Sequence, residues 1–347
     1  MRYAIVSDIH ANLPAWKAVL RDIKLNGADE IICLGDVVGY GPMPRAVLDD
    51  VHEHIDQMVI GNHDAVVCGR FDENNFTESA RKIIQWTRDQ LSDEAVSLFS
   101  SLPSDLAGDG FAAAHAEIAD PERFGYIEDE QMARESFIAS DATMIFVGHT
   151  HLASIFIQDI LTGSIYQHHS VDFSAATDMR YIVNVGSVGD PRDRDDIRAC
   201  YCLYDVESKE VTYRRVPFDL ATYRLGLKQS GLSIYPYFLS SVDGHPEVIP
   251  VQDWKPKIVV RPTRSPAGIK LSRSHLARVT MPGAANPNIL CTTSTDEKKK
   301  HALVRKHKGF IARERQDLAD AHREKQELAA KLTSMQKSAL ARRRNKR

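Results

Sequence analysis

Five short clusters of aspartate, asparagine and histidine lie along the first 151 residues of the chain. The clusters are Asp8-Ile9-His10, Gly35-Asp36, Gly61-Asn62-His63-Asp64, a single His115, and Gly148-His149-Thr150-His151. Carboxylate and imidazole groups together favour manganese, iron, zinc or nickel ions, whereas purely oxygen ligands favour magnesium or calcium. Because no cysteine occurs in the clusters, the residue types predict a mixed nitrogen and oxygen site for a transition metal.

Two such ions side by side would suit the hydrolysis of phosphate esters. The negative charge of an ester repels an attacking hydroxide. Two cations about 3.5–4 Å apart neutralise this charge, lower the pKa of a bridging water and hold the resulting hydroxide in line for attack. Cations this close need an anionic ligand between them, and a carboxylate can supply one. The clusters contain both carboxylates and several imidazoles.

Nearly every cluster follows a short apolar run, and such runs between glycine and polar residues predict buried strands. The runs cover residues 3–6, 31–34, 58–60, 111–114 and 144–147. In open α/β sheets, ligands bind just beyond the carboxyl ends of the strands. We therefore expect residues that are distant in sequence to converge at one edge of a sheet.

Apolar residues at helical spacing predict four helices between these runs, and a strand-rich region follows residue 151. The predicted helices cover residues 12–25, 44–55, 77–91 and 131–140. The later predicted strands cover residues 154–157, 164–167, 181–184, 199–204 and 211–215, with a hairpin turn at 205–209 and a closing helix at 220–227.

The order of the clusters resembles that of the calcineurin-like metallophosphoesterase superfamily, and more closely its small bacterial and archaeal phosphodiesterase-like members. The supporting segments are Ser7-Asp8-Ile9-His10-Ala11-Asn12-Leu13, Gly35-Asp36-Val37-Val38-Gly39-Tyr40-Gly41-Pro42 and Asn184-Val185-Gly186-Ser187-Val188-Gly189. The resemblance covers about residues 1–230, and five clusters in one order are far more specific than any single motif. It implies an α/β (α+β) fold, a two-sheet β-sandwich flanked by helices in four αββα layers.

The resemblance also implies a role for each residue. Asp8, His10 and His151 would hold a first divalent ion, Asn62, His115 and His149 a second, and Asp36 would bridge the two. His63 would face the phosphate as a general acid or electrostatic stabiliser, and Asp64 would orient its ring. A histidine with a pKa of about 6.5 can donate a proton near neutral pH. Manganese is the expected metal, with iron, zinc or nickel as alternatives.

Individual residues of this set also have ordinary structural explanations. The alternatives are a helix cap for Asp8 or Asp64, a turn for Asp36 and a core position for His115. His149 and His151 are harder to explain in this way. The order of the whole set favours the metal site.

The function implied is that of a binuclear metal-dependent phosphoesterase, a hydrolase that cleaves phosphodiester or phosphomonoester bonds through a metal-bridging hydroxide. The expected substrate is small or nucleotide-like. One alternative is a Ser/Thr protein phosphatase, although the Asp-Arg-Gly run of those enzymes is missing after Asp36. Another alternative is a non-catalytic binding module that keeps the fold and works through a polyanion-binding tail.

Two features depart from the family pattern. Ala116 stands after His115 where many relatives carry glycine, and its methyl group would narrow the approach to the second ion. The loop at residues 190–196 is strongly charged, and Arg192 or Arg194 is a candidate for binding a phosphate. Solvated loop charges are the alternative explanation.

Composition divides the chain into three segments. Residues 1–230 would form the metallophosphoesterase domain. Residues 231–295 contain eight of the fifteen prolines and predict a poorly ordered linker. Residues 296–347 lack proline and predict a basic helical tail, in which seven of ten positions of a heptad seam are apolar.

The charge is distributed unevenly along the chain. Residues 255–347 hold 24 basic and 7 acidic residues, whereas residues 1–254 hold 20 basic and 40 acidic residues. A basic segment of this kind predicts binding to nucleic acid or another polyanion. The alternatives are a solvated extension and a homodimer formed through the helical seam.

The remaining composition predicts a cytoplasmic globular protein. Its hydrophobic content of 43% suits a packed core. No apolar run is long enough for a transmembrane helix, and the N-terminal residues lack the apolar region of a signal peptide. The five cysteines are odd in number and lack zinc-type spacing, so we expect no disulfide framework, and we expect Cys33, Cys200 and Cys202 in the core.

Overall fold

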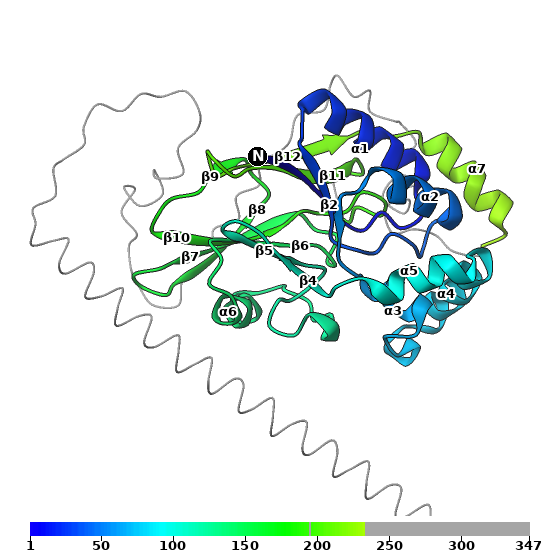
Figure 1. Cartoon of the computed structure of the whole chain (residues 1–347), viewed down its shortest axis with the longest axis horizontal. Coiled ribbons are helices and arrows are strands. Elements are labelled where there is room, and N and C mark those ends of the chain that lie inside the picture. The colour runs from blue at the N-terminus through cyan, green and yellow to red at the C-terminus, as the bar shows by residue number, and fades with distance from the viewer. Residues whose placement is uncertain (194–195, 233–347) are drawn as a thin grey trace, which may run out of the picture. The chain divides into compact units, whose positions relative to one another are not determined.

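A computed structural model describes residues 1–193 and 196–232, and Figure 1 shows the arrangement of its strands and helices. Within these residues the strands form two six-stranded sheets. The first sheet has the order β3 (Gln57–Met58), β2 (Glu30–Cys33), β1 (Arg2–Val6), β11 (Ala199–Asp205), β12 (Glu210–Val216) and β9 (Phe173–Ser174). The second has the order β4 (Asp105–Ala107), β5 (Phe111–Ala114), β6 (Met144–Val147), β10 (Met179–Asn184), β7 (Ser154–Asp159) and β8 (Ile165–His169).

Six of the helices in the described residues lie in the connections between these strands, and α7 follows the last strand. The helices are α1 (Leu13–Asn26), α2 (Pro44–His54), α3 (Asn62–Cys68), α4 (Glu78–Gln90), α5 (Asp93–Ser101), α6 (Glu130–Ala139) and α7 (Leu220–Ser230), with short 3₁₀ turns at Glu73–Asn75 and Pro121–Arg123. Among the described residues, no helix combines the length and the apolar character that a membrane span requires.

Alternating side chains of the strands build the layers of the fold. Ala4 of β1 packs with Trp16 of α1 on one face of the first sheet, whereas the next residue, Ile5, packs with Phe146 of β6 between the two sheets. On the outer face of the second sheet, residues of β6 and β10 pack against Phe137 of α6. Two helix layers therefore enclose two sheets, which confirms the predicted αββα sandwich (Figure 1).

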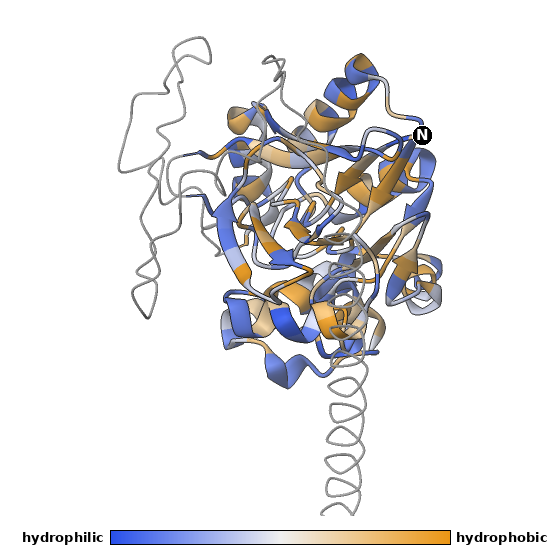
Figure 2. Cartoon of the chain, turned by 90° about the vertical axis from the view of Figure 1, so that its left-hand side faces the viewer, coloured by the Kyte–Doolittle hydropathy of each residue, from blue (hydrophilic) through white to orange (hydrophobic). Residues whose placement is uncertain are grey.

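Helix α1 shows why the local sequence gives this arrangement. The Asn12 side chain accepts a hydrogen bond from the Ala15 amide at 3.1 Å, so it caps the first turn, where Pro14 costs no hydrogen bond. Gly27 ends the helix in the left-handed conformation. One face of the helix is apolar and buried, and Figure 2 shows the corresponding contrast of hydrophobic and hydrophilic residues along the helices.

Parallel pairing brings the carboxyl ends of several strands to one edge. Strand β1 runs parallel to β2, and β2 runs parallel to β3. Strand β6 runs parallel to both β5 and β10. Within each sheet the loops after neighbouring strands meet, since the Gly148 amide donates to the His115 carbonyl at 2.9 Å and the Asp8 amide donates to the Gly35 carbonyl at 3.0 Å. Across the sandwich, the His149 amide donates to Asp8 Oδ2 at 3.1 Å.

Most predicted elements are present within a few residues of the expected positions. Two helices had no counterpart in the prediction. Helix α5 is short, and α3 begins directly at Asn62, inside a cluster interpreted only as a strand end. The run at residues 58–60 gives little strand, because β3 contains only Gln57–Met58 and the Ile60 amide donates to the Pro103 carbonyl instead of a neighbouring strand.

The described cysteines behave as expected. Cys33, Cys200 and Cys202 are buried, and burial raises the pKa of all three thiols, that of Cys200 to about 12. The predicted basic tail, and the predicted linker beyond its first two residues, lie outside the described residues.

Candidate metal centre

All seven predicted metal ligands lie at the strand edge described above and are buried. Asp8 follows β1, Asp36 follows β2, and Asn62 begins α3 after β3. His115 follows β5, and His149 and His151 follow β6. The first sheet therefore supplies the carboxylates, and the second sheet supplies most of the imidazoles.

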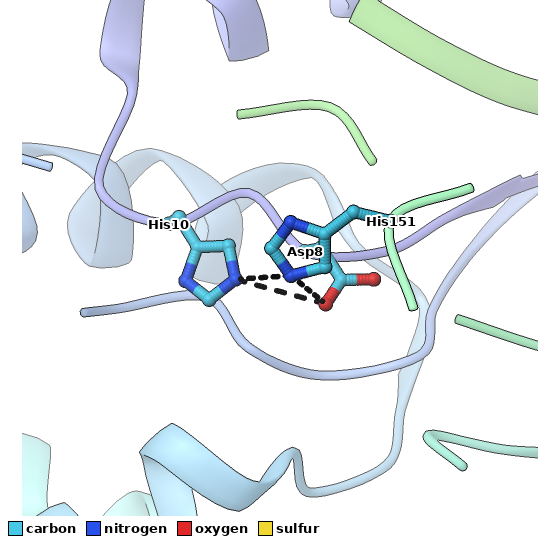
Figure 3. Close-up of side chains that lie close together, drawn as sticks. All are labelled: Asp8, His10 and His151. Carbon is cyan, nitrogen blue, oxygen red and sulfur yellow. Dashed lines mark hydrogen bonds and ion pairs between the residues drawn. The ribbon is translucent and has the colours of Figure 1, made fainter. Parts of the chain in front are cut away.

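Asp8, His10 and His151 form one compact group, shown in Figure 3. Their ligand atoms all lie within 4.8 Å of one another. His151 Nε2 lies 3.2 Å from Asp8 Oδ1, and His10 Nε2 lies 3.7 Å from the same oxygen. The two Nε2 atoms are 3.1 Å apart. Three potential ligand atoms that lie this close together form the arrangement expected around a metal ion.

Asp36, His115 and His149 form a second group with the same separation limit of 4.8 Å. His115 Nε2 lies 3.1 Å from His149 Nδ1 and 3.0 Å from Asn62 Oδ1. The amide oxygen of Asn62 thus joins the two imidazoles. The group contains the residues that the resemblance assigned to the second ion, together with the assigned bridge.

Asp36 lies between the two groups. Its Oδ2 atom is 3.6 Å from His10 Nε2 in the first group and 3.4 Å from His115 Nε2 in the second. Its Oδ1 atom accepts a hydrogen bond from the His63 amide at 2.9 Å, which fixes the orientation of the carboxylate. One oxygen that faces both groups has the position that a bridging ligand requires.

Backbone contacts of three imidazoles direct the lone pairs of their neutral rings into the centre. The Nδ1 atoms of His10, His115 and His151 lie 3.1, 2.8 and 2.7 Å from the carbonyl oxygens of Val38, Leu34 and Asp190. A carbonyl only accepts, so each Nδ1 carries the hydrogen, and in the neutral ring Nε2 carries a lone pair. Opposed lone pairs gain no hydrogen bond, whereas a shared cation satisfies them. Backbone contacts of this type commonly orient metal-binding histidines.

Unpartnered polar atoms support the same conclusion. Among the residues that the structure describes, Asp8 Oδ1 and His149 Nε2 are buried without a hydrogen-bond partner. Leaving such groups unpaired costs free energy unless another interaction compensates. For the carboxylate oxygen of Asp8, which faces two imidazole nitrogens, a cation supplies that compensation. The donors present therefore fit divalent metal ions of the kind predicted from the sequence.

The backbone is strained at the same positions. Asp8, His10, Asp36, His149 and His151 have φ angles of 54°, 46°, 53°, 66° and 60°, in the left-handed region that residues other than glycine seldom adopt. Strain of this kind is concentrated at functional sites. β6 ends at Val147, so His149 and His151 lie beyond the strand, and each belongs to one of the two ligand groups of the centre.

His63 lies beside the centre, but Asp64 does not orient its ring. The two Asp64 oxygens accept hydrogen bonds from the amides of Val37, Val38 and Gly61 at 3.3, 3.2 and 3.3 Å. The His63 Nδ1 atom is buried and has no hydrogen-bond partner in the described part of the chain. Asp64 therefore caps α3 and holds the loop after β2, and the expected contact with His63 is absent because the carboxylate is already occupied by backbone groups.

Aromatic rings enclose His63 instead. The ring centroids of Tyr40, Phe76 and His10 lie 4.5, 4.9 and 5.0 Å from that of His63. Burial, followed by the charges of the neighbouring histidines, lowers the pKa of His63 well below its ordinary value. The ring is thus neutral at neutral pH in these surroundings, so it lacks the proton that a histidine with a pKa of about 6.5 could donate.

The two groups differ in their electrostatics. Burial lowers the pKa of His151, but the nearby Asp8 carboxylate outweighs it and raises this pKa to about 9. Burial lowers the pKa of His115 to about 4. Burial and the charges of Asp64 and Asp8 raise the pKa of Asp36 well above its ordinary value. Bringing these carboxylates together costs free energy because their charges repel, and bound cations would remove this repulsion.

Several residues around the centre were missed by sequence reasoning. Asp190 supports His151 with its carbonyl oxygen and with Oδ2, which lies 3.2 Å from Nδ1. Tyr126 stacks on the His149 ring with a centroid distance of 4.0 Å. The glycines and proline around Tyr40 and Asp190 are the sequence signal that could have directed attention to these loops. Ala116 is buried with Ile60 and Phe124.

Comparison with known proteins agrees with the fold. Residues 1–209 match the calcineurin-like phosphoesterase superfamily domain. The uncharacterized protein MJ0912 of Methanocaldococcus jannaschii is 32% identical over 221 residues, which cover 62% of this chain and 88% of that protein.

Two solved structures extend the comparison. A metallophosphoesterase from Sphaerobacter thermophilus has a TM-score of 0.61 at 35% identity, and the match covers 70% of this chain and 100% of that one. The hypothetical protein PH1004 of Pyrococcus horikoshii OT3 shares the fold, with a TM-score of 0.53 at 18% identity over 68% of this chain and 96% of that one. With the order of its ligands and the sandwich that gathers them, the chain belongs to the calcineurin-like phosphoesterase superfamily.

Proposed function

We propose that this protein is a phosphoesterase that uses two divalent metal ions to hydrolyse a phosphodiester or phosphomonoester bond in a small, nucleotide-like substrate. The observation that carries the proposal is the position of Asp36 Oδ2, which lies 3.6 Å from His10 Nε2 and 3.4 Å from His115 Nε2. A mononuclear site would not need a carboxylate between two groups of ligands. Membership of the superfamily supports the same reaction class.

In this proposal each group of ligands holds one ion. Asp8, His10 and His151 hold the first, Asn62, His115 and His149 hold the second, and Asp36 serves both. When bound, the two cations neutralise the charge of the ester and lower the pKa of a water molecule between them. The mixture of oxygen and imidazole donors leads us to propose manganese.

His63 has a separate role, that of stabilising the leaving oxygen. Its buried Nδ1 atom has no partner within the described residues, and its lowered pKa keeps the ring neutral. A neutral imidazole still donates one hydrogen bond, and a preorganised donor stabilises the charge that develops on a leaving oxygen. The close packing of Tyr40 and Phe76 fixes the ring in place. Asp64 contributes indirectly, because it fixes the first turn of α3, which carries His63.

The proposal is tested by adding metal back to chelator-treated protein. The substrates are bis(4-nitrophenyl) phosphate and 4-nitrophenyl phosphate, each with manganese, nickel, zinc or magnesium. We expect turnover only with metal present, and two ions per chain by elemental analysis. The ratio of diester to monoester hydrolysis then defines the class. Two bound ions without turnover on either ester would refute a general phosphoesterase and favour a binding protein.

A further inference from the structure

The loop between β10 and β11 places an arginine beside the metal centre, and the proposed reaction has so far given it no role. The Arg192 amide donates a hydrogen bond to the carbonyl of His151 at 3.3 Å. This ties the loop to one of the proposed metal ligands. Asp190, two residues earlier, supports the ring of the same histidine. The backbone of Arg192 therefore holds this residue beside a proposed metal ligand, independently of the contacts of its side chain.

The guanidinium of Arg192 is only partly paired. It forms a hydrogen bond with the Tyr40 side chain, and its Nη2 atom lies 3.4 Å from Asp190 Oδ2. Its Nε atom is buried without a hydrogen-bond partner in the part of the chain that the structure describes. Arg198, further along the same loop, is different: its Nε and Nη2 atoms lie 2.9 and 2.8 Å from the two oxygens of Asp196. The second geometry is the two-pronged pairing that an arginine makes with an oxyanion. Arg192 lacks such a partner for its buried edge.

The Arg192 guanidinium also lies near the residues that we propose take part in the reaction. The guanidinium carbon lies 6.0 Å from the centroid of the Tyr40 ring, which itself packs on His10 and His63. The charge of Arg192 also acts on Asp36, after burial and the Asp64 and Asp8 carboxylates. Three segments therefore direct these side chains toward one region: the β10–β11 loop carries Arg192, the β2–α2 loop carries Asp36 and Tyr40, and α3 carries His63.

The charge of the centre with two metal ions bound indicates that the partner of the Arg192 side chain is an anion. Two divalent cations would exceed the negative charge of Asp8 and Asp36, and Arg192 adds a further positive charge. Asp190 offsets only part of this surplus, because it is shared between Arg192 and His151. An arginine next to two cations is repelled unless an anion lies between them. A surplus of positive charge in a confined site attracts anionic ligands.

We infer that Arg192 binds a non-bridging oxygen of the substrate's phosphoryl group and so determines specificity for anionic phosphate. The inference rests on the proposed function. The guanidinium offers two N–H groups at a fixed spacing, which match two oxygens of a phosphate better than the single ammonium of a lysine does. Arg192 would thereby hold the ester while the opposite side of the phosphorus faces the ions.

The test measures the affinity of inorganic phosphate for the full-length, manganese-loaded protein by isothermal titration calorimetry. Arg192→Met should weaken phosphate binding about 10- to 100-fold, the effect of losing a charged hydrogen bond. Arg192→Lys keeps the charge but loses the fork, so it should fall between the wild type and Arg192→Met. Arg198→Met is the matched control, since it removes a loop arginine that is paired with Asp196, and it should retain the affinity of the wild type.

Metal content separates a binding role from a structural one. All four proteins should bind two manganese ions. If Arg192→Met binds phosphate as tightly as the wild type, or loses phosphate binding only in proportion to lost metal, the inference is wrong. The proposed function fails separately: wild-type protein that binds two ions and phosphate but hydrolyses no ester would refute the activity and leave the role of Arg192 in phosphate binding standing.

Discussion

The Nε2 atoms of His10 and His151 lie 3.1 Å apart, although each ring has directed its Nδ1 hydrogen to a backbone carbonyl. The two side chains come from different sheets and are 141 residues apart in the sequence. Neither ring can rotate to relieve the contact without losing its carbonyl partner. When both rings are neutral their Nε2 lone pairs oppose each other, and a metal ion fits the position between them. Without metal, the proton that His151 keeps up to its pKa of about 9 takes that position.

Metal removal should consequently destabilise the fold. A ligand at 100 times its dissociation constant stabilises the native state by about 2.7 kcal/mol. For a domain of this size, that corresponds to a rise in Tm of about 5–10 °C. We expect this difference between manganese-loaded and chelator-treated protein in a thermal melt. An Asp8→Asn variant should lose much of the metal-dependent rise, and an unchanged rise in that variant would argue against Asp8 as a ligand.

Replacement of Asp36 should lower the activity more than replacement of any other carboxylate. Asp36→Asn keeps the shape of the side chain but removes the charge shared by the two groups, so we expect less than two bound ions and a loss of turnover of about 1,000-fold or more. Asp105→Asn, at an exposed position of β4, serves as the control for a lost carboxylate. Full activity of Asp36→Asn would contradict the two-metal proposal.

His63 should affect turnover without affecting metal content. Removal of one preorganised hydrogen-bond donor typically lowers kcat by about 100- to 1,000-fold. His63→Ala should show this loss with both ions still bound. The groups that accompany His63 within ligand distance are His10 and Asp36, so loss of metal in this variant would instead identify His63 as a ligand.

Metal binding should release protons and strengthen as the pH rises. Burial lowers the pKa of His151, yet the Asp8 carboxylate raises it to about 9, so without metal this ring is protonated at neutral pH. A cation must displace that proton, and this group alone should strengthen binding about tenfold per pH unit below pH 9. Calorimetry in buffers with different ionisation enthalpies would count the released protons, and a binding constant independent of pH would contradict this account.

The same group gives the stability of the metal-free protein an opposite trend. The pKa of His151 in the folded chain, about 9, exceeds its unfolded value of about 6.5. The stabilising contribution of the His151–Asp8 pair is thus complete below about pH 6.5 and disappears as the pH rises through 9. Denaturant unfolding of chelator-treated protein should show this decrease, and it should be absent in His151→Gln.

Gly148 should be required because of the space around it. A Cβ atom at this position would collide with Ser7 Oγ and lie 2.6 Å from Asp8 Oδ2. Gly148→Ala should therefore displace Asp8 and weaken the first metal site. Gly69→Ala is the control, since that glycine has open space around it and φ of +82°, so it should cost stability without costing metal. Normal metal content in Gly148→Ala would show that the backbone can shift to accommodate the methyl group.

The basic tail should bind polyanions in a salt-sensitive way. Replacing the five basic residues of positions 342–347 with glutamine in the full chain removes part of the surplus positive charge. The slope of log affinity for single-stranded nucleic acid against log salt concentration should become shallower, because fewer counterions are released. An unchanged slope would locate the binding elsewhere, and no binding by the wild type would refute the prediction.

Much of the metal centre could be predicted because its ligands follow directly after short apolar strands. Asp8, Asp36 and His115 each lie within three residues of a strand end, so a local pattern was enough to place them together. The left-handed conformation of His149 and His151 could not be predicted, since strand periodicity gives no information about residues beyond the last strand position.

The residues that support the centre were harder to predict because their partners are remote. Asp190 contacts His151 across 39 positions, and no spacing in the sequence indicates that contact. The role assigned to Asp64 was wrong for a related reason. A carboxylate in the first turn of a helix satisfies nearby backbone amides, and this local demand is stronger than a contact with the adjacent ring.

Each of the two ligand groups draws on both sheets, since Asp8 and His10 follow β1 whereas His151 follows β6, and Asn62 follows β3 whereas His115 follows β5. An ion in either group therefore acts as a cross-link across the sandwich. Amide hydrogens of β1 and β6 should exchange more slowly when metal is bound, although no new hydrogen bond forms in either strand. The metal ions that we propose support the reaction would therefore also hold the two sheets together.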